Sequence, residues 1–143
     1  MAVARARGPA DAVEAQWRVL SLRWGWMREW HESERPGVPY PRVVELIEAA
    51  GAEPGLRRLF PFTSHYNLTF SSCIEHPYAV RVPFVEPLRD GRFRVRRRGS
   101  GGLVIGETDT AQEAVALVMA HFPDDLRPAV AGTADDLDVG GAH

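Results

Sequence analysis

The sequence predicts an α+β domain in which helices cover one face of a four-stranded antiparallel sheet, in the order helix, helix, four strands, helix. Apolar residues recur every three or four positions in the first third of the chain, and every second position from residue 65 onward. Tight turn sequences separate the predicted strands, which is typical of antiparallel neighbours. We expect one domain over residues 1–129, with its core over 41–123, and an acidic tail without fixed structure over 130–143.

A long helix is predicted over residues 10–32, with Asp11 as its N-cap and Glu14 at the capping-box spacing. Two apolar stripes run side by side along it. The first stripe is Val13, Trp17, Leu20, Trp24 and Met27, and the second is Val19, Leu22, Trp26 and Trp30. So wide an apolar surface needs cover on two sides, from the body of the domain and from a second element, a ligand or another chain.

A proline-rich break then separates this helix from a second one, which is expected to start near Pro41 and to stop at Gly51. Residues 53–62 are predicted to be a short helical turn or an irregular connector. The strands that follow are marked by the alternating rows Tyr66/Leu68/Phe70, Tyr78/Val80/Val82/Phe84 and Phe93/Val95, and by the run 103–107. Asp90–Gly91 predicts a two-residue hairpin turn, and residues 108–122 predict a capped final helix.

The polar rows of these strands form a first candidate site, because they share the free face of the sheet if the apolar rows face the helices. This candidate site comprises His65, Asn67, Thr69, Arg81 and Arg94. Arginines can hold a carboxylate or phosphate by paired hydrogen bonds, and His65 can exchange a proton near neutral pH as a catalytic acid or base. The alternative is an ordinary solvated sheet face.

The long helix offers a second candidate site. Its four tryptophans, Trp17, Trp24, Trp26 and Trp30, can wall an apolar pocket or bind a partner chain, with Arg23 inside the apolar sector as a ligand-binding residue. The alternatives are an aromatic core helix or one side of a homodimer interface.

Composition and motifs exclude several other classes. A formal net charge of −2 argues against nucleic acid, and no apolar run is long enough to span a membrane. Cys73 is the single cysteine, so no internal disulfide can form, and we expect a cytoplasmic protein. Cys73 and His76 have a Cys-x-x-His spacing but lack further ligands, so no metal site is predicted. Neither phosphate-binding nor dinucleotide motifs occur, so no cofactor is predicted.

Two stretches carry a resemblance to a known family: the segment Leu56–Cys73, beginning Leu-Arg-Arg-Leu-Phe-Pro-Phe, and the strand and helix over 102–123. Across residues 55–123 the chain resembles a family of small actinobacterial natural-product biosynthesis proteins of unknown function (domain of unknown function 6193). The resemblance implies a role in specialised metabolism, and it implies no catalytic residues.

Two functions are compatible with these features. The first is a protein that binds a small molecule or peptide in a biosynthetic pathway, with cofactor-free acid–base catalysis of a cyclisation, isomerisation or dehydration as an extension. The second is a non-catalytic interaction module that docks a pathway enzyme, or a second copy of itself, through the tryptophan-rich helix.

Overall fold

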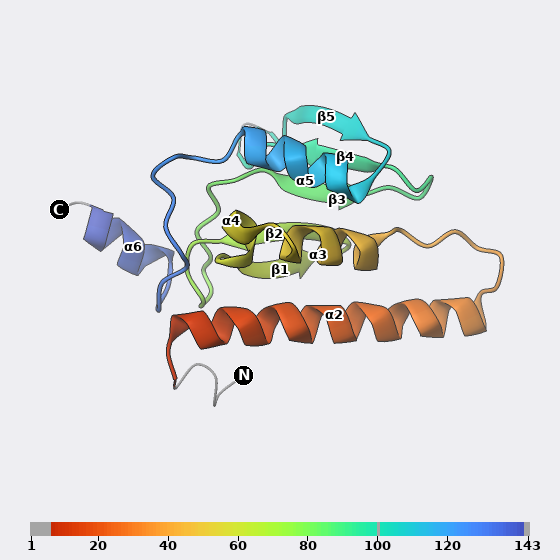
Figure 1. Ribbon diagram of the computed structural model, residues 1–143, viewed down its shortest axis with the longest axis horizontal. Helices are drawn as coiled ribbons and strands as arrows, with labels where there is room; N and C mark the ends of the chain where they lie inside the picture. Colours follow the sequence, from red (N-terminus) through yellow and green to blue (C-terminus); the bar gives the residue numbers. More distant parts are fainter. Residues whose placement is uncertain (1–6, 100, 142–143) are drawn as a thin grey trace.

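The computed structural model describes residues 7–99 and 101–141, and it confirms an α+β fold with an antiparallel sheet (Figure 1). The sheet has five strands in sequence order, one more than predicted. The elements are α2 (Pro9–Glu34), α3 (Val43–Gly51), α4 (Pro54–Arg57), β1 (Phe60–Ser64), β2 (Asn67–Ser71), β3 (Phe84–Pro87), β4 (Phe93–Arg96), β5 (Val104–Thr108), α5 (Ala111–Ala120) and α6 (Ala134–Gly141).

The additional strand is β1, which occupies the segment predicted to be a connector. It pairs antiparallel with β2, from Phe60 opposite Ser71 to Ser64 opposite Asn67. Pro61 argues against a strand in the sequence because it has no N–H to donate to a ladder. The structure accommodates it because β1 lies at the edge of the sheet, where one side of the strand needs no partner.

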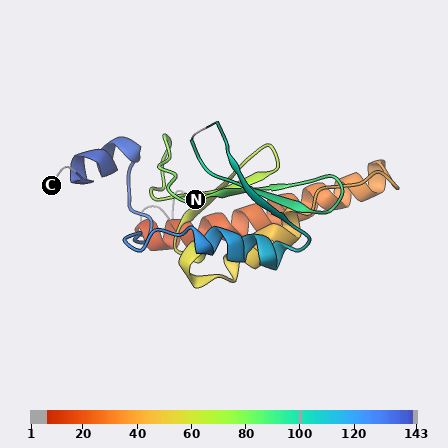
Figure 2. The same ribbon diagram turned by 90° about the horizontal axis from the view of Figure 1, so that it is seen from above.

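The strand register shows that the helices share one face of the sheet. One continuous row of directly opposite residues crosses all five strands: Thr63, Leu68, Val85, Val95 and Gly106. At one end of this row Thr63 receives a hydrogen bond from Trp24 of α2, and at the other end Gly106 faces Leu117 of α5. Helices α2, α3 and α5 therefore lie on the same side of the sheet, as Figure 2 shows.

Trp17 holds α2 to this face. Its indole Nε1–H donates to the carbonyl oxygens of Arg57 at 3.0 Å and Leu59 at 3.2 Å, immediately before β1. Its ring centroid lies 6.2 Å from that of Phe70 on β2, and only 1% of Trp17 is exposed. One side chain thus joins the long helix to the first two strands.

The cap predicted at the start of the final helix is right, and the start predicted for the long helix is wrong. Asp11 is not the N-cap of α2, because the helix begins earlier, with Pro9 in its first turn after Gly8. Proline suits this position because its missing N–H would be unpaired in any first turn. The cap of α5 is confirmed, since Thr110 Oγ1 accepts from the backbone N–H of Glu113 at 3.1 Å.

The strand predicted over 78–84 is mostly irregular, and only Phe84–Pro87 joins the sheet. Pro83 removes a backbone donor within this segment, and Pro77 directly precedes it. The predicted hairpin between β3 and β4 is present, but its loop is longer than two residues. Of its turn residues only Gly91 has positive φ, at 88°, whereas a two-residue type I′ turn would need two such residues.

The region expected to be an unpacked acidic tail is described up to residue 141. Val130 donates to the carbonyl of Ser72 and accepts from Ile74, and Ala134 donates to the carbonyl of Pro77. These bonds tie the chain back to the segment after β2 before α6 begins. Residues 142 and 143 lie outside the described part.

Replacing Trp17 by alanine is expected to lower the free energy of unfolding by about 3–5 kcal/mol, because it empties a core site and leaves two carbonyls without their donor. Leu103→Ala is the matched control, since this large apolar side chain is 56% exposed, and it should cost no more than about 0.5 kcal/mol. Urea denaturation followed by circular dichroism measures both. Equal losses in the two variants would contradict the central position of Trp17.

Candidate functional site

The first candidate site is not assembled as the sequence suggested, because His65 is not on a strand. His65 and Tyr66 form the two-residue loop between β1 and β2, and His65 has a φ of 58°. The alternation that appeared to start at His65 starts at Asn67. His65 is exposed and precedes β2, so it is not part of the polar row of that strand.

The other members of that site are also separated. Thr69 is buried in the sheet, opposite Phe62 on β1. Phe62 is in turn stacked on Tyr78 at 4.4 Å, so the segment after β2 covers this half of the face that was expected to be open. Arg81 lies outside the sheet and pairs with Asp125 at 3.1 Å. Arg23, which belongs to the second candidate site, donates to Thr63 Oγ1 at 3.3 Å.

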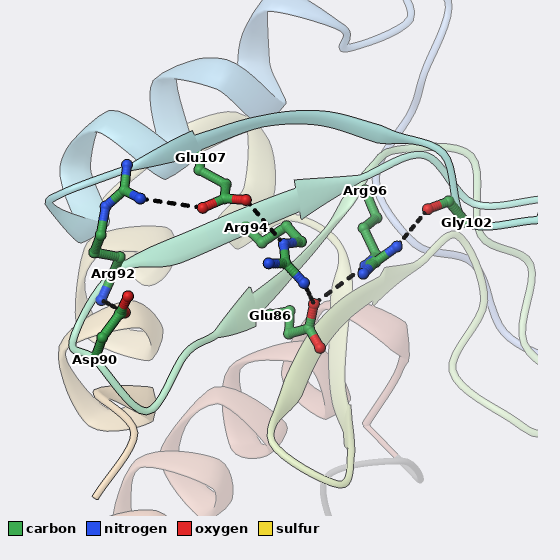
Figure 3. Close-up of polar contacts among 7 residues, drawn as sticks. All are labelled: Glu86, Asp90, Arg92, Arg94, Arg96, Gly102 and Glu107. Atoms are coloured by element: carbon green, nitrogen blue, oxygen red, sulfur yellow. Dashed lines mark hydrogen bonds and ion pairs between the residues drawn. The ribbon is translucent and has the colours of Figure 1, made fainter. Parts of the chain in front are cut away.

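The other half of that face carries arginines, as predicted, but each already has a carboxylate partner (Figure 3). Arg94 lies between Glu107, at 3.2 Å, and Glu86, at 3.6 Å, and Arg96 contacts the same Glu86 oxygen at 3.1 Å. Further contacts join Arg92 to Glu107 and Asp109, and Arg96 to the carbonyl of Gly102. The guanidinium groups of β4 are therefore internally neutralised and offer little to an external anion.

A different concavity has better chemistry for binding, and we call it the Tyr40 pocket. Its volume is about 600 Å³, and it lies where the last turns of α2, the connector to α3, the β1–β2 loop and the β3–β4 loop meet. Its lining residues are Trp30, His31, Arg35, Val38, Pro39, Tyr40, Pro41, Tyr66 and Arg89.

The proline-rich connector forms one wall of the Tyr40 pocket because it folds back on the end of α2. The backbone N–H of Arg35 donates to the carbonyl of His31 at 2.8 Å, and Gly37 takes a φ of 83° that favours glycine. His31 Nε2 then lies 3.0 Å from the carbonyl oxygen of Val38. Since a carbonyl only accepts, Nε2 carries the proton, and this bond fixes the loop over the helix end.

Tyr40 has the most unusual environment in the pocket. Its hydroxyl is buried and has no hydrogen-bond partner within the described part of the chain. Its ring lies 4.9 Å from that of His31 and meets Tyr66 edge-on at 5.9 Å. Burial and the neighbouring Tyr66 raise the pKa of Tyr40 to about 12, against the opposing charge of Arg28. The phenol is therefore a protonated donor across the neutral range.

The charge of the pocket comes from Arg35 and Arg89. Neither has an ion-pair partner among residues 7–99 and 101–141, and no carboxylate is among the lining residues. The remaining walls are aromatic rings, prolines and a valine. Unpaired guanidiniums beside an apolar, aromatic enclosure are suited to an anion attached to an apolar body.

Sequence reasoning missed this pocket because its residues come from four separate segments. The sequence predicts only a helix break over the proline-rich connector, and it predicts Tyr66 in the inward row of a strand. The sequence offers one signal for this pocket, namely His31 at the end of an apolar stripe beside prolines and Tyr40. That signal does not identify Tyr66 or Arg89 as further pocket residues.

The four tryptophans do not form a common pocket. Trp17 and Trp24 are buried against the sheet, whereas Trp26 is 74% exposed and Trp30 is 54% exposed. Trp30 borders the Tyr40 pocket, and Trp26 does not. The expected set of partner-binding tryptophans is thus divided into a core pair and a surface pair.

The described residues contain neither a candidate metal site nor a candidate membrane-spanning helix. Within 7–99 and 101–141 no three His, Cys, Asp or Glu side chains are placed so that they could hold a metal ion. In the same part of the chain, no helix combines the length and the apolar character that crossing a membrane requires.

Comparison with known proteins identifies the family. A family model described as a family of unknown function, DUF6193, matches residues 11–133. The chain belongs to this family. The match extends well beyond the segment 55–123 that carries the resemblance in the sequence, and it includes α2 and the Tyr40 pocket. Searches of the curated proteins and of the solved structures gave no significant match.

The high pKa of Tyr40 gives a measurable pH dependence. In an alkaline titration followed by tyrosinate absorbance, one of the three tyrosines should ionise only near pH 12. Because the pKa in the folded state lies above the ordinary value of 10, the associated stability is present below pH 10 and is lost as the pH rises to about 12. Tyr40→Phe should remove the late phase and Tyr78→Phe should keep it, and a late phase that survives in Tyr40→Phe would refute the assignment.

The carboxylate that Arg94 and Arg96 share should contribute to stability. Glu86→Gln is expected to lower the free energy of unfolding by about 1 kcal/mol, because it disrupts a half-buried network that joins β3 to β4. Asp125→Asn is the control, since it breaks the isolated surface pair with Arg81 and should change the value by no more than about 0.5 kcal/mol. Urea denaturation compares them, and an unaffected Glu86→Gln would show that the network is dispensable.

Proposed function

We propose that this protein binds a small anionic molecule with an aromatic or apolar body, or the carboxyl end of such a peptide, in the Tyr40 pocket. The observation that carries the proposal is the buried Tyr40 hydroxyl, which has no hydrogen-bond partner among the described residues and lies in a cavity that Arg35 and Arg89 also line. A buried donor without an acceptor costs about 1–3 kcal/mol. A ligand oxygen that accepts from Tyr40 would remove this cost.

The surrounding groups define the ligand class. Arg35 and Arg89 favour a carboxylate or phosphate, which can accept several charge-assisted hydrogen bonds. The rings of Trp30, Tyr40 and Tyr66 favour a flat or apolar body, which buries area against them. A volume of about 600 Å³ is within the range of small-molecule pockets.

Binding rather than catalysis is the core of this proposal. His65, the acid–base residue suggested by the sequence, is absent from the pocket lining, and His31 uses one ring nitrogen to fix the connector. A role in natural-product biosynthesis is part of the proposal and is supported only by the resemblance of the sequence. A cytoplasmic location is proposed on the lack of an internal disulfide.

The exposed Trp26 and Trp30 favour a second candidate function, docking of another protein chain on α2. Large aromatic side chains on a solvent-facing helix are a common property of protein–protein interfaces. The surface that this second function would use overlaps the lining of the Tyr40 pocket only at Trp30.

Isothermal titration calorimetry with indole-3-acetate and with phenyl phosphate tests the ligand class. At least one anion should bind, and indole-3-acetamide, which lacks the charge, should bind about tenfold more weakly than indole-3-acetate. Tyr40→Phe and Arg89→Gln should each weaken binding of the anion by about tenfold. Arg98→Gln and His65→Ala are the controls and should bind as the wild type does, with melting temperatures measured for all variants.

Failure of both anions to bind would refute the anionic ligand class. A loss in His65→Ala with unchanged binding in Tyr40→Phe would move the site to the β1–β2 loop. Either result is separable from misfolding by the melting temperatures.

A further inference from the structure

We infer that the outer face of α2 is the interface of a homodimer, in which α2 packs antiparallel on α2 of a second copy. The outer face is defined by Val19, Leu22, Trp26 and Trp30, which succeed one another at helical spacing and are exposed. α2 forms one edge of the molecule, and in Figure 1 no other labelled element lies below it. The inference makes the docking candidate specific and does not depend on a ligand in the Tyr40 pocket.

The outer face is too apolar to be an ordinary solvated helix surface. Leu22 is 69% exposed and Trp26 is 74% exposed, although both are large apolar side chains. Shallow concavities lie on both sides of the Trp26 ring, one toward Leu22 and the other toward Trp30. A ring that projects between two hollows can enter a matching surface, as tryptophan anchors do at interfaces.

The order of side chains along the outer face favours an antiparallel partner. Leu22 and Trp26 are equally far from Trp24, near the middle of α2, and Val19 and Trp30 are equally far from it within one residue. A twofold axis near Trp24 therefore places the smaller Leu22 opposite Trp26 of the second copy, and Val19 opposite Trp30. A parallel pair would instead place each tryptophan against its own equivalent.

The positions of two charged residues on α2 also favour an antiparallel partner. Arg18 and Glu29 are eleven positions apart, about three helical turns, so they border the same edge of the outer face. Neither has an ion-pair partner within the described ranges. In an antiparallel pair, this edge of α2 lies along the same edge of the partner helix, which runs in the opposite direction. Arg18 of each copy therefore lies near Glu29 of the other copy, which gives two ion pairs. A parallel pair would instead place this edge against the opposite edge of the partner, and Arg18 would not meet Glu29.

Arg23 borders the opposite edge near the middle of the helix, where the two copies of this residue would approach one another. Its guanidinium is drawn toward β1, because Nη2 donates to Thr63 Oγ1. This contact leaves the centre of the outer face to Leu22 and Trp26. Like charges at the twofold axis are thereby held apart.

The dimer would also affect the Tyr40 pocket. Trp30 lines both the pocket and the outer face, so a second copy that covers Trp30 reaches the border of the pocket. The exposed face is short, from Val19 to Trp30, and we therefore expect an interface at the small end of the specific range and a concentration-dependent dimer.

Sedimentation velocity over a wide concentration range, from about 1 μM to several hundred micromolar, tests the interface. The wild type should shift from monomer to dimer, and Trp26→Ala should raise the dissociation constant at least about tenfold. Arg18→Glu and Glu29→Arg should each weaken the dimer, because each creates two like-charge contacts. Arg98→Glu, in the connection between β4 and β5 and outside α2, is the charge-matched control and should dimerise as the wild type does.

Charge exchange separates the antiparallel dimer from every other arrangement. The double variant Arg18→Glu/Glu29→Arg should dimerise again, and an equimolar mixture of the two single variants should form heterodimers in preference to either homodimer. A wild type that stays monomeric throughout would overturn the inference. So would single charge variants that dimerise normally, or a mixture that gains nothing over its components. Melting temperatures of every variant identify any loss that is due to misfolding.

Discussion

The packing of α2 against the first two strands is the constraint on which the rest of this structure depends. Trp17 makes this packing contact. Its ring is buried, and its indole N–H is shared between two carbonyl oxygens just before β1. Glu14 adds an ion pair with Arg57 at 2.6 Å, and the Arg57 guanidinium lies over the Trp17 ring. Because the helix is fixed near its start, its last turns extend beyond the strands (Figure 2), and the connector must fold back to reach α3.

The connector creates the Tyr40 pocket by folding back on α2. As a result, the arginines of the pocket and the arginines of β4 have different surroundings. On β4, the pleat sets each arginine beside a carboxylate of a neighbouring strand, so the charges cancel within the sheet. In the pocket, Arg35 and Arg89 come from loops, and neither forms an ion pair within the part of the chain that the structure describes. Among the described residues these guanidinium groups have no carboxylate partner and the Tyr40 phenol has no acceptor, and this difference from the β4 network supports the proposed binding role.

The pocket and the outer face of α2 meet at Trp30. α2 carries apolar side chains on its core face and on its outer face, which is why its sequence shows two apolar stripes and not one. If both proposals hold, ligand and partner contact the same side chain, and the two binding events are expected to influence each other. The physical link is a single ring shared by the two surfaces.

The sequence by itself determined the fold class, the long helix, the presence of a cap on the final helix, the hairpin before β4 and the two-sided apolar character of α2, because these follow from periodicity and local turn chemistry. It also placed the chain in its family by resemblance. Only the tertiary structure decided that β1 is a strand despite Pro61, that His65 lies in a loop, and that Arg94 and Arg81 are already paired. Edge position, loop geometry and ion pairing depend on residues distant in sequence, and so does a pocket built from four segments.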